Sequence, residues 1–234
     1  MLSQQKWTPS ERNRLQQKPL FQLEQVGVHF GELKAIHRLD LVVFPREIVF
    51  ITGQSGAGKT TLLHLLAGEI SPTSGQIKRA HDFYPQTFTS VVFQDLRLFS
   101  SKTAEENIFY SYDENLFDSI HVFKQEMMEY ARALGALEHL NKKINECNGG
   151  MKQKIALLRA LMSKPEVIIL DEPTSALDRE STYKMYELLS YLNVKKGLTV
   201  LWATHNKELV KQFSGKSVHL DKGQLVFAGN ACFI

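Results

Sequence analysis

The chain has 234 residues, of which 43% are hydrophobic, which is enough for one α/β domain with a substantial core but short for two. Its net charge is +3, and the excess lies in residues 1–20, which hold four basic residues and one acidic residue. The rest of the chain carries 24 basic and 24 acidic residues. A neutral body of this kind lacks the surface that follows nucleic-acid phosphates, so we expect no nucleic-acid partner.

The sequence predicts neither a membrane span nor an export signal. The longest apolar runs, such as residues 167–170, have the length of a strand and fall far short of the roughly 18 residues that cross a bilayer. The first residues lack the apolar stretch and the cleavage site of a secretory signal. The two cysteines, Cys147 and Cys232, show neither disulfide nor metal spacing, which agrees with a reducing compartment. We therefore expect a cytoplasmic protein.

Residues 1–20 are polar and rich in glutamine, which predicts a loose arm before one domain of residues 21–234. Alternating polar and apolar residues in FQLEQVGVHF and LDLVVF predict two strands of an antiparallel edge sheet. The more hydrophobic EIVFIT predicts a central strand. It is followed by GQSGAGKT and the leucine-rich TLLHLLAG, which together predict a glycine loop and a helix that ends at Gly68.

The middle of the chain is predicted to be helical, as a subdomain of about residues 95–163. One helix is expected over residues 118–140, where apolar residues recur at three- and four-residue steps: Ile120, Phe123, Met127, Tyr130, Leu134 and Leu137. Another is expected after the glycine pair 149–150, through IALLRALM. VIILDEP then predicts a buried strand, followed by a helix after Asp178, the strand LTVLWATH and the hairpin SVHLDKGQLVFAG. Strands that alternate with helices predict an α/β fold with a largely parallel sheet.

Residues 53–60 fit the pattern GxxxxGK[ST] of a phosphate-binding loop, and they lie between a strand and a helix as that pattern requires. Glycines let the backbone approach phosphate closely, and the N–H groups at the helix start face the negative oxygens. Lys59 supplies a mobile cation, and Thr60 is the predicted ligand of Mg²⁺. The predicted nucleotide contacts are Gly53, Gln54, Ser55, Gly56, Ala57, Gly58, Lys59, Thr60 and Thr61.

VIILDEP places two carboxylates, Asp171 and Glu172, at the end of a buried strand. The carboxyl ends of strands are where an open α/β sheet binds its ligand. There Asp171 can hold Mg²⁺ through water, and Glu172 can polarise the attacking water. The alternative is an acid pair that caps the next helix, which the four apolar residues before the pair disfavour.

Six motifs follow one another in the order found in ATP-binding cassette (ABC) ATPases: GQSGAGKT, the glutamine of VVFQD, the glycine pair of CNGGM, VIILDEP, SALD and ATH. From about Phe21 to Gly229 the chain resembles this family. The resemblance implies an ABC nucleotide-binding domain, with a parallel sheet around the phosphate loop, an N-terminal antiparallel β subdomain and a helical subdomain. It also implies that the ligands are ATP and Mg²⁺.

The same resemblance assigns roles to residues outside the phosphate loop. It implies that Gln94 senses the γ-phosphate and Mg²⁺, and that His205 contacts the γ-phosphate. Ser175 and Asp178 lie in the loop that communicates between two protomers in this family. Phe30 occupies the place where such cassettes stack an aromatic side chain on adenine, although a simple core role is the alternative.

The chain departs from the family at the signature, where LSGGQ is replaced by CNGGM. Gly149, Gly150 and the following basic helix keep the backbone donors that face phosphate on the opposite protomer. Asn148 replaces a serine hydroxyl with a larger amide, and Met151 replaces an amide with a weakly polar thioether. A homodimer carries these changes in both sites. We therefore predict ATP binding with slow hydrolysis, and the alternative is an ATP clamp that does not hydrolyse.

Within the family, FITGQSGAGKTTLL and VVFQDLRLF followed by ENI resemble the cell-division (FtsE-type) ATPases. This resemblance implies a homodimer on the cytoplasmic face of the inner membrane, bound to an FtsX-like integral membrane protein and regulating peptidoglycan hydrolases. The alternative is the ATPase subunit of a lipoprotein-releasing or peptide-exporting transporter. The apolar residues Leu96, Leu98, Phe99 and Phe109 lie where such cassettes receive a partner's coupling helix, or else they are ordinary core. The basic arm either contacts lipid or the partner, or is a disordered end.

Overall fold

The computed structural model describes residues 18–83 and 88–230. Most of the predicted arm, together with Cys232, lies outside these residues. Leu20 is already part of the folded domain, because its side chain is buried and its N–H donates to the carbonyl of Val43 over 2.8 Å. No helix within the two described segments is both long and apolar enough to cross a membrane.

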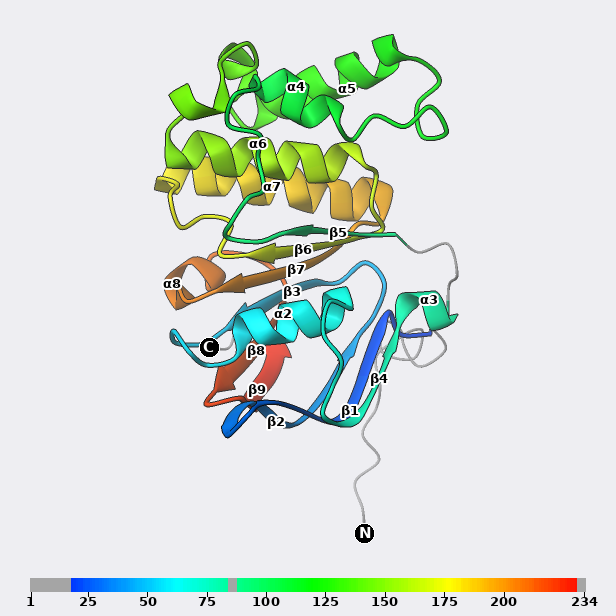
Figure 1. The fold of residues 1–234 in the computed structure, drawn as a ribbon, viewed down its shortest axis with the longest axis vertical. Coiled ribbons are helices and arrows are strands. Elements are labelled where there is room, and N and C mark those ends of the chain that lie inside the picture. Colours follow the sequence, from blue (N-terminus) through cyan, green and yellow to red (C-terminus); the bar gives the residue numbers. More distant parts are fainter. Residues whose placement is uncertain (1–17, 84–87, 231–234) are drawn as a thin grey trace.

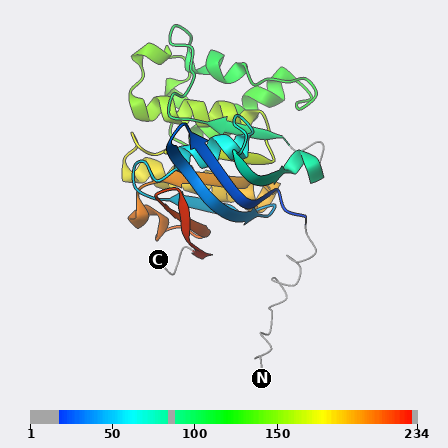
Figure 2. The same cartoon turned by 60° about the horizontal axis from the view of Figure 1, so that its bottom comes forward.

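A small antiparallel sheet has the order β2-β1-β4 (Figure 2). Its strands are β1 (Phe21–Phe30), β2 (Leu33–Val43) and β4 (Ser74–Arg79). The sequence predicted the first two strands, although β2 begins earlier than LDLVVF. It did not predict β4, because SGQIKR is polar and mostly exposed and therefore lacks the alternation that marks a half-buried strand.

The larger sheet has six strands in the order β5-β6-β7-β3-β8-β9 (Figure 1). They are β3 (Ile48–Thr52), β5 (Thr89–Val92), β6 (Val167–Asp171), β7 (Thr199–Thr204), β8 (Lys216–Asp221) and β9 (Gln224–Asn230). The first five strands in this order are parallel, and β9 pairs antiparallel with β8. As the sequence predicted, β3 is an interior strand and the sheet is largely parallel.

Each face of this sheet contributes to a separate hydrophobic core. Side chains that alternate along β3, β6 and β7, such as Phe50, Leu170 and Trp202, pack with the helices of the upper half of Figure 1. Their neighbours, such as Ile51 and Ile169, pack with the leucines of the first long helix and with the antiparallel sheet. Because successive side chains of a strand point to opposite faces, one short strand supports both cores.

The helices are α2 (Lys59–Ala67), α3 (Ala80–Phe83), α4 (Ala104–Phe109), α5 (Ile120–Ala133), α6 (Gly149–Met162), α7 (Arg179–Lys196) and α8 (Lys207–Val210), with 3-10 turns η1 (Leu137–His139) and η2 (Ile144–Glu146). The predicted C-terminus of α2 at Gly68 is confirmed. The prediction of one helix over residues 118–140 is wrong. The helix ends at Ala133, because Gly135 takes a left-handed conformation with φ of 63° that an α-helix cannot continue. Ile120, predicted on the buried face, is 47% exposed.

Candidate nucleotide-binding site

The glycine loop between β3 and α2 depends on Gly58, where the backbone has a positive φ and approaches β2 closely. Gly58 precedes the helix with φ of 98°, a region that residues with a side chain rarely adopt. A Cβ atom at this position would lie only 2.6 Å from the carbonyl oxygen of Ala35. The glycine therefore allows the loop to turn and to pack against β2 at the same point, which leaves the first N–H groups of α2 facing the cleft.

The side chain of Lys59 folds back over the glycine loop and is hydrogen-bonded to its backbone. Its side chain is buried, and its ammonium donates to the carbonyls of Gly53 (2.8 Å) and Gln54 (3.1 Å). The same nitrogen lies 3.7 Å from Oε1 of Glu172. Residues of β3, α2 and the end of β6 thus converge on one cation, which is positioned for negative oxygens above the loop.

Thr60 and Asp171 form a pair suited to a hard cation. The Thr60 hydroxyl donates to Oδ2 of Asp171 over 2.8 Å. Oδ1 of Asp171 is buried and has no hydrogen-bond partner within the described parts of the chain. Burial raises the pKa of Asp171, and the hydrogen bond from Thr60 opposes this effect. A buried carboxylate oxygen without a partner, beside a hydroxyl, fits the oxygen ligands that Mg²⁺ prefers.

Glu172 is held in an uncommon backbone conformation, with φ of 50°. Its N–H donates to the carbonyl of Ala203 on β7 over 3.0 Å, so the neighbouring strand fixes this geometry. Oε1 of Glu172 lies 2.9 Å from Nδ1 of His205. The carboxylate is 9% exposed, whereas the histidine side chain is 65% exposed. The end of β7 therefore brings an accessible imidazole against a buried carboxylate.

These residues line one cleft of about 980 Å³ at the carboxyl edge of the six-stranded sheet. The predicted site residues on its wall are Gln54, Ser55, Gly56, Gly58, Lys59, Thr60, Thr61, Gln94, Asp171, Glu172, Ser175 and His205. Gly53 and Ala57 form the back of the loop: Gly53 carries the carbonyl that accepts from Lys59, and Ala57 is buried. The sequence did not predict Lys34 or Lys222, which add positive charge to the wall of the cleft. No local motif marks either lysine.

Phe30, predicted to contact adenine, is not among the residues that line the cleft. It is 53% exposed at the end of β1, and the cleft wall nearby is formed by Leu33, Lys34 and Ala35 of β2. The prediction that it stacks on adenine stays a prediction.

The signature residues lie at the start of α6, away from the wall of this cleft. Asn148 caps the helix, because its Oδ1 accepts from the N–H of Met151 over 2.8 Å. The helix begins at Gly149 itself, so the glycine pair forms its first turn. The Met151 side chain is 7% exposed and packs in the helical core. Asp178 caps α7 in the same way, through the N–H of Ser181 over 2.7 Å.

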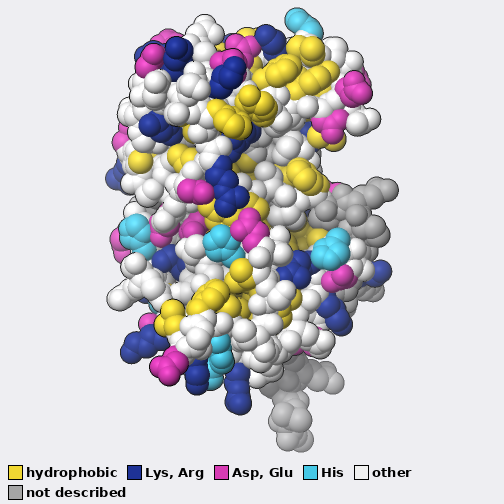
Figure 3. All heavy atoms as spheres, viewed as in Figure 1, with side chains coloured by type: hydrophobic (Ala, Val, Ile, Leu, Met, Phe, Trp, Pro, Cys, Tyr) yellow, Lys and Arg dark blue, Asp and Glu magenta, His cyan; other side chains and the backbone are white. Residues whose placement is uncertain are grey.

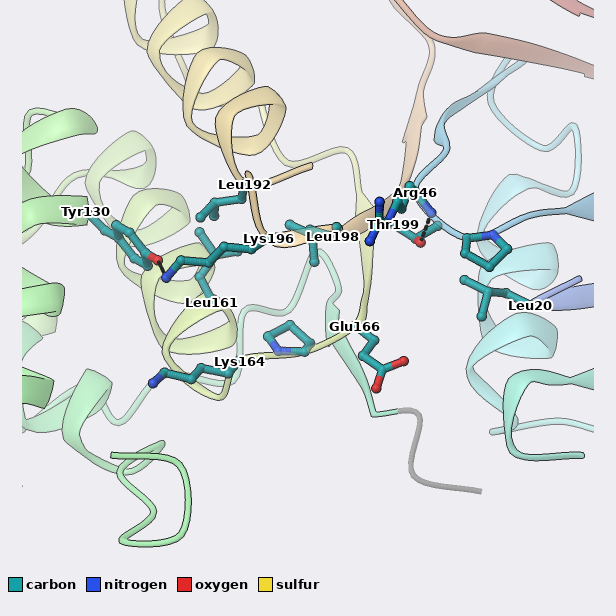
Figure 4. A pocket seen from close by; sticks show the side chains of 13 residues that line it. Leu20, Arg46, Tyr130, Leu161, Lys164, Glu166, Leu192, Lys196, Leu198 and Thr199 are labelled. Atoms are coloured by element: carbon teal, nitrogen blue, oxygen red, sulfur yellow. Dashed lines mark hydrogen bonds between the residues drawn. The ribbon is translucent and has the colours of Figure 1, made fainter. Parts of the chain in front are cut away.

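A second cavity, of about 510 Å³, lies at the opposite edge of the sheet (Figure 4). Its wall includes Glu166 and Thr199, which are at the amino ends of β6 and β7, together with Leu161, Leu192 and Leu198. The ammonium of Lys196 points to Tyr130, with 2.6 Å between nitrogen and hydroxyl oxygen. Because open α/β sheets bind their ligands at the carboxyl ends of strands, this cavity is not the expected place for the nucleotide.

The comparisons with known proteins agree with this geometry. The sequence model of the ABC transporter family matches residues 36–175. The arginine transport ATP-binding protein ArtM of Bacillus subtilis is 30% identical over 220 residues, which are 90% of this chain and 91% of that protein. The cell division ATP-binding protein FtsE of Streptococcus pneumoniae is 32% identical over 202 residues, 82% of this chain and 87% of that protein.

Other relatives are longer. The spermidine/putrescine import ATP-binding protein PotA of Bacillus cereus is 33% identical, and the match covers 89% of this chain but 65% of PotA. Among solved structures, the dimeric ATP-binding cassette MJ0796 bound to ADP and Pi superposes with a TM-score of 0.77 at 27% identity, covering 90% of this chain and 98% of that one.

A family match over more than half of the chain, together with relatives at 30% identity or more along most of both sequences, defines the class. The chain belongs to the ABC transporter family of ATP-binding proteins and is an ABC-type P-loop ATPase. ATPases of this family bind ATP, generally with Mg²⁺, dimerise and pair with membrane components. Relatives with different physiological roles match about equally well, so family membership alone does not choose among those roles.

Proposed function

We propose that this chain is the ATPase subunit of a cell-division complex of the FtsE type. In this proposal two copies close on ATP and change the conformation of an FtsX-like integral membrane protein that regulates peptidoglycan hydrolysis. The protein would act at the cytoplasmic face of the inner membrane, bound there by its partner. Support comes from the resemblance of the phosphate-loop and VVFQDLRLF segments and from the match to FtsE over most of both chains.

The cleft supplies the parts that phosphoryl transfer needs. Lys59 offsets negative charge on the transferred phosphoryl group, and His205 lies where it can contact the same oxygens. Glu172, held by β7 and paired with His205, is placed to orient the attacking water. When bound, Mg²⁺ would neutralise phosphate charge, with Thr60, Gln94 and Asp171 as the residues that hold it.

The second half of each site would come from the other protomer. Asn148 and the backbone of Gly149 and Gly150 are the groups we propose for that contact. The Met151 side chain is committed to the helical core, so its contribution would be limited to the backbone. The Oδ1 atom of Asn148 is used as the cap of α6, which leaves its Nδ2 to donate to phosphate. Hydrolysis is expected to be slow because an amide replaces a small hydroxyl.

One observation supports the assignment of a membrane partner: an exposed, largely aromatic surface that includes Phe99, five residues after Gln94 in the sequence. We call it the aromatic patch; it consists of Phe99, Phe109, Tyr110 and Ile120, which are 53%, 39%, 60% and 47% exposed. Hydrophobic side chains gather over α4 and α5 in Figure 3, and a groove of about 480 Å³ runs beside Phe109, Tyr110 and Ile120. Of the four residues predicted for this role, Leu96 and Leu98 are partly buried against the core instead.

An exposed apolar surface of this kind is suited to a partner helix. We propose that the coupling helix of the membrane partner docks on the aromatic patch. The short segment from Gln94, on the cleft wall, to Phe99 would then link the partner to the nucleotide cleft.

A second candidate is the ATPase subunit of a transporter. It is favoured by one specific observation, namely that ArtM and PotA, whose names describe arginine transport and spermidine/putrescine import, match this chain about as well as FtsE does. The chemistry in the cleft would be the same, and only the membrane partner would differ. Lipoprotein-releasing and peptide-exporting subunits belong to this candidate as well.

Coexpression with defined membrane proteins tests the proposal. The chain would be produced with the FtsX-like protein of its own genome, or with a transporter permease from the same genome, and purified in detergent. We expect a stable complex and stimulated ATP hydrolysis with the FtsX-like protein only. Association with the permease alone would contradict the cell-division role and support the transport role.

Two variants make this test specific to the aromatic patch. Changing Phe99 and Phe109 to serine should abolish the complex and leave basal ATP hydrolysis unchanged. Phe227→Ser is the matched control, because Phe227 is similarly exposed but lies on β9, in the other half of the molecule. A complex that survives the double change would overturn the proposed docking surface.

A further inference from the structure

The amide of Gln153 connects the two halves of the catalytic machinery within one chain. Gln153 lies on α6, two residues after the signature, and is 8% exposed. Its Nε2 donates to the Ser175 hydroxyl over 2.7 Å and, more weakly, to the carbonyl of Glu172 over 3.4 Å. Its Oε1 accepts from the N–H of Ala176 over 3.1 Å. Because a backbone N–H can only donate, this last contact fixes the orientation of the amide.

The same helix and loop are also in close steric contact. A Cβ atom on Gly149 would lie 3.2 Å from the Cβ of Ala176, and one on Gly150 would lie 2.7 Å from the carbonyl oxygen of Ala176. The first turn of α6 therefore rests directly on the loop that follows Glu172. Hydrogen bonds to Gln153 on one side and this glycine contact on the other join helix and loop as one unit.

We propose that Gln153 is a positioning residue that couples the signature helix to the backbone of Glu172. Glu172 has a strained left-handed conformation, and its carbonyl accepts from both Ser175 N–H (3.1 Å) and Gln153. Binding of ATP on the opposite protomer would displace the start of α6. Gln153, which is hydrogen-bonded to Ser175 and to the Glu172 carbonyl, would pass this displacement on to the backbone of Glu172. The site that a protomer completes for its partner thereby adjusts the carboxylate in its own site.

This inference rests on membership of the ATPase family and not on the cell-division role. The purified chain alone is enough for the test, so its outcome is independent of any membrane partner.

Gln153→Met is the main variant, because methionine has a similar size and removes all three hydrogen bonds. Gln125→Met on the exposed face of α5 is the matched control. We expect single-turnover hydrolysis to fall about tenfold or more, which corresponds to about 1.4 kcal/mol. The affinity of the monomer for ATP without Mg²⁺ should remain within about twofold of wild type. The dependence of hydrolysis on ATP concentration should become less cooperative.

Two results would overturn the proposal. One is hydrolysis within about twofold of wild type in folded Gln153→Met, and the other is a loss of ATP affinity as large as the loss of rate, which would indicate that Gln153 only supports the fold.

If Gln153→Met does not fold, Gln153→Glu tests the proposal instead. It keeps the acceptor for Ala176 N–H and cannot donate to the Glu172 carbonyl, so we expect the same loss of rate with unchanged ATP affinity. Ser175→Ala provides a double-variant cycle with whichever change at position 153 folds. The two effects on rate should be less than additive, and fully additive effects would show that Gln153 does not act through Ser175.

Discussion

The carboxyl edge of the six-stranded sheet and the helical subdomain are built in different ways. At the sheet edge, Lys59, Asp171 and Glu172 are each less than 9% exposed. A hydrogen bond from Thr60 and a charge pair join the start of α2 to the end of β6 there. In the helical subdomain, the aromatic patch is exposed and the start of α6 lies outside the wall of the chain's own cleft. One region holds buried charged side chains against one another, and the other exposes apolar side chains at its surface.

This difference indicates where substitutions should act. Changes at the sheet edge should affect chemistry within one protomer, because the groups there are already in place. Changes in the helical subdomain should affect events that need a second molecule. A residue such as Gln153, which belongs to both regions, should affect the link between them.

The largest effect is expected from Glu172→Gln. The amide cannot accept a proton from water as the carboxylate does, so hydrolysis should fall about 10²- to 10³-fold. Binding of ATP should persist, because Lys59 and the phosphate loop are unchanged. The variant should therefore accumulate as an ATP-bound dimer, measured by size-exclusion chromatography with light scattering in the presence of Mg²⁺ and ATP.

Glu187→Gln provides the control, since Glu187 is exposed on α7. It should hydrolyse ATP at the wild-type rate and show no trapped dimer. A Glu172→Gln protein that stays monomeric with ATP would contradict the proposed closure of two protomers around the nucleotide.

A smaller change, in the opposite direction, is expected from Asn148→Ser. Serine caps a helix about as well as asparagine, so α6 should keep its start. The shorter hydroxyl should fit the partner's γ-phosphate better, and we expect turnover to rise about five- to tenfold, or about 1 kcal/mol. Steady-state phosphate release with and without the membrane partner measures this effect.

The second signature change, Met151→Gln, tests whether position 151 affects the stability of the fold or the rate of hydrolysis. Because the Met151 side chain is buried, glutamine there should lower stability without a further gain in rate.

Asn115→Ser, on the exposed loop before α5, is the control for Asn148→Ser. If Asn148→Ser leaves turnover unchanged while wild type is fast, Asn148 is an adequate phosphate contact and the prediction of slow hydrolysis is wrong.

The sequence predicted the sheet edge well because its signals are local. A phosphate loop is a contiguous pattern, and its last two residues begin α2. VIILDEP ends a strand in acids, and the carboxyl ends of parallel strands meet at one edge. These two facts are enough to bring Thr60 and Asp171 together, although 111 residues separate them.

The helical subdomain was harder to predict because its decisive contacts are long-range. Periodicity continued past Ala133, but a left-handed Gly135 ended the helix there. Burial of Met151 depends on how α6 packs with the rest of the core. The contact of Gln153 with Ser175 joins residues 22 positions apart, in two elements that show no shared pattern.

The smallest effect is expected at Glu126, whose ion pair links α5 of the helical subdomain to α7. Glu126 on α5 is 16% exposed; it accepts from the Tyr130 hydroxyl (2.5 Å) and pairs with Lys196 of α7 and, over 3.7 Å, with Lys164. Burial alone would raise the pKa of Glu126, but the hydrogen bonds from Lys196 and Tyr130 outweigh it and lower the pKa below its usual 4.5. The paired carboxylate should therefore stabilise the protein above about pH 4.5, and this contribution should disappear as the pH falls through the lowered pKa.

Glu126→Gln should consequently reduce the free energy of unfolding by about 1–2 kcal/mol at pH 7, measured by urea denaturation. The deficit should shrink when the same measurement is repeated near pH 4, because the carboxylate of the unfolded chain then takes up a proton while the pKa of the paired carboxylate is lowered. Glu129→Gln, at an exposed position of the same helix, should change stability by less than about 0.5 kcal/mol at either pH. A deficit that is the same at both pH values would show that charge does not hold α5 to α7, and that packing around Tyr130 joins the helical subdomain to the sheet.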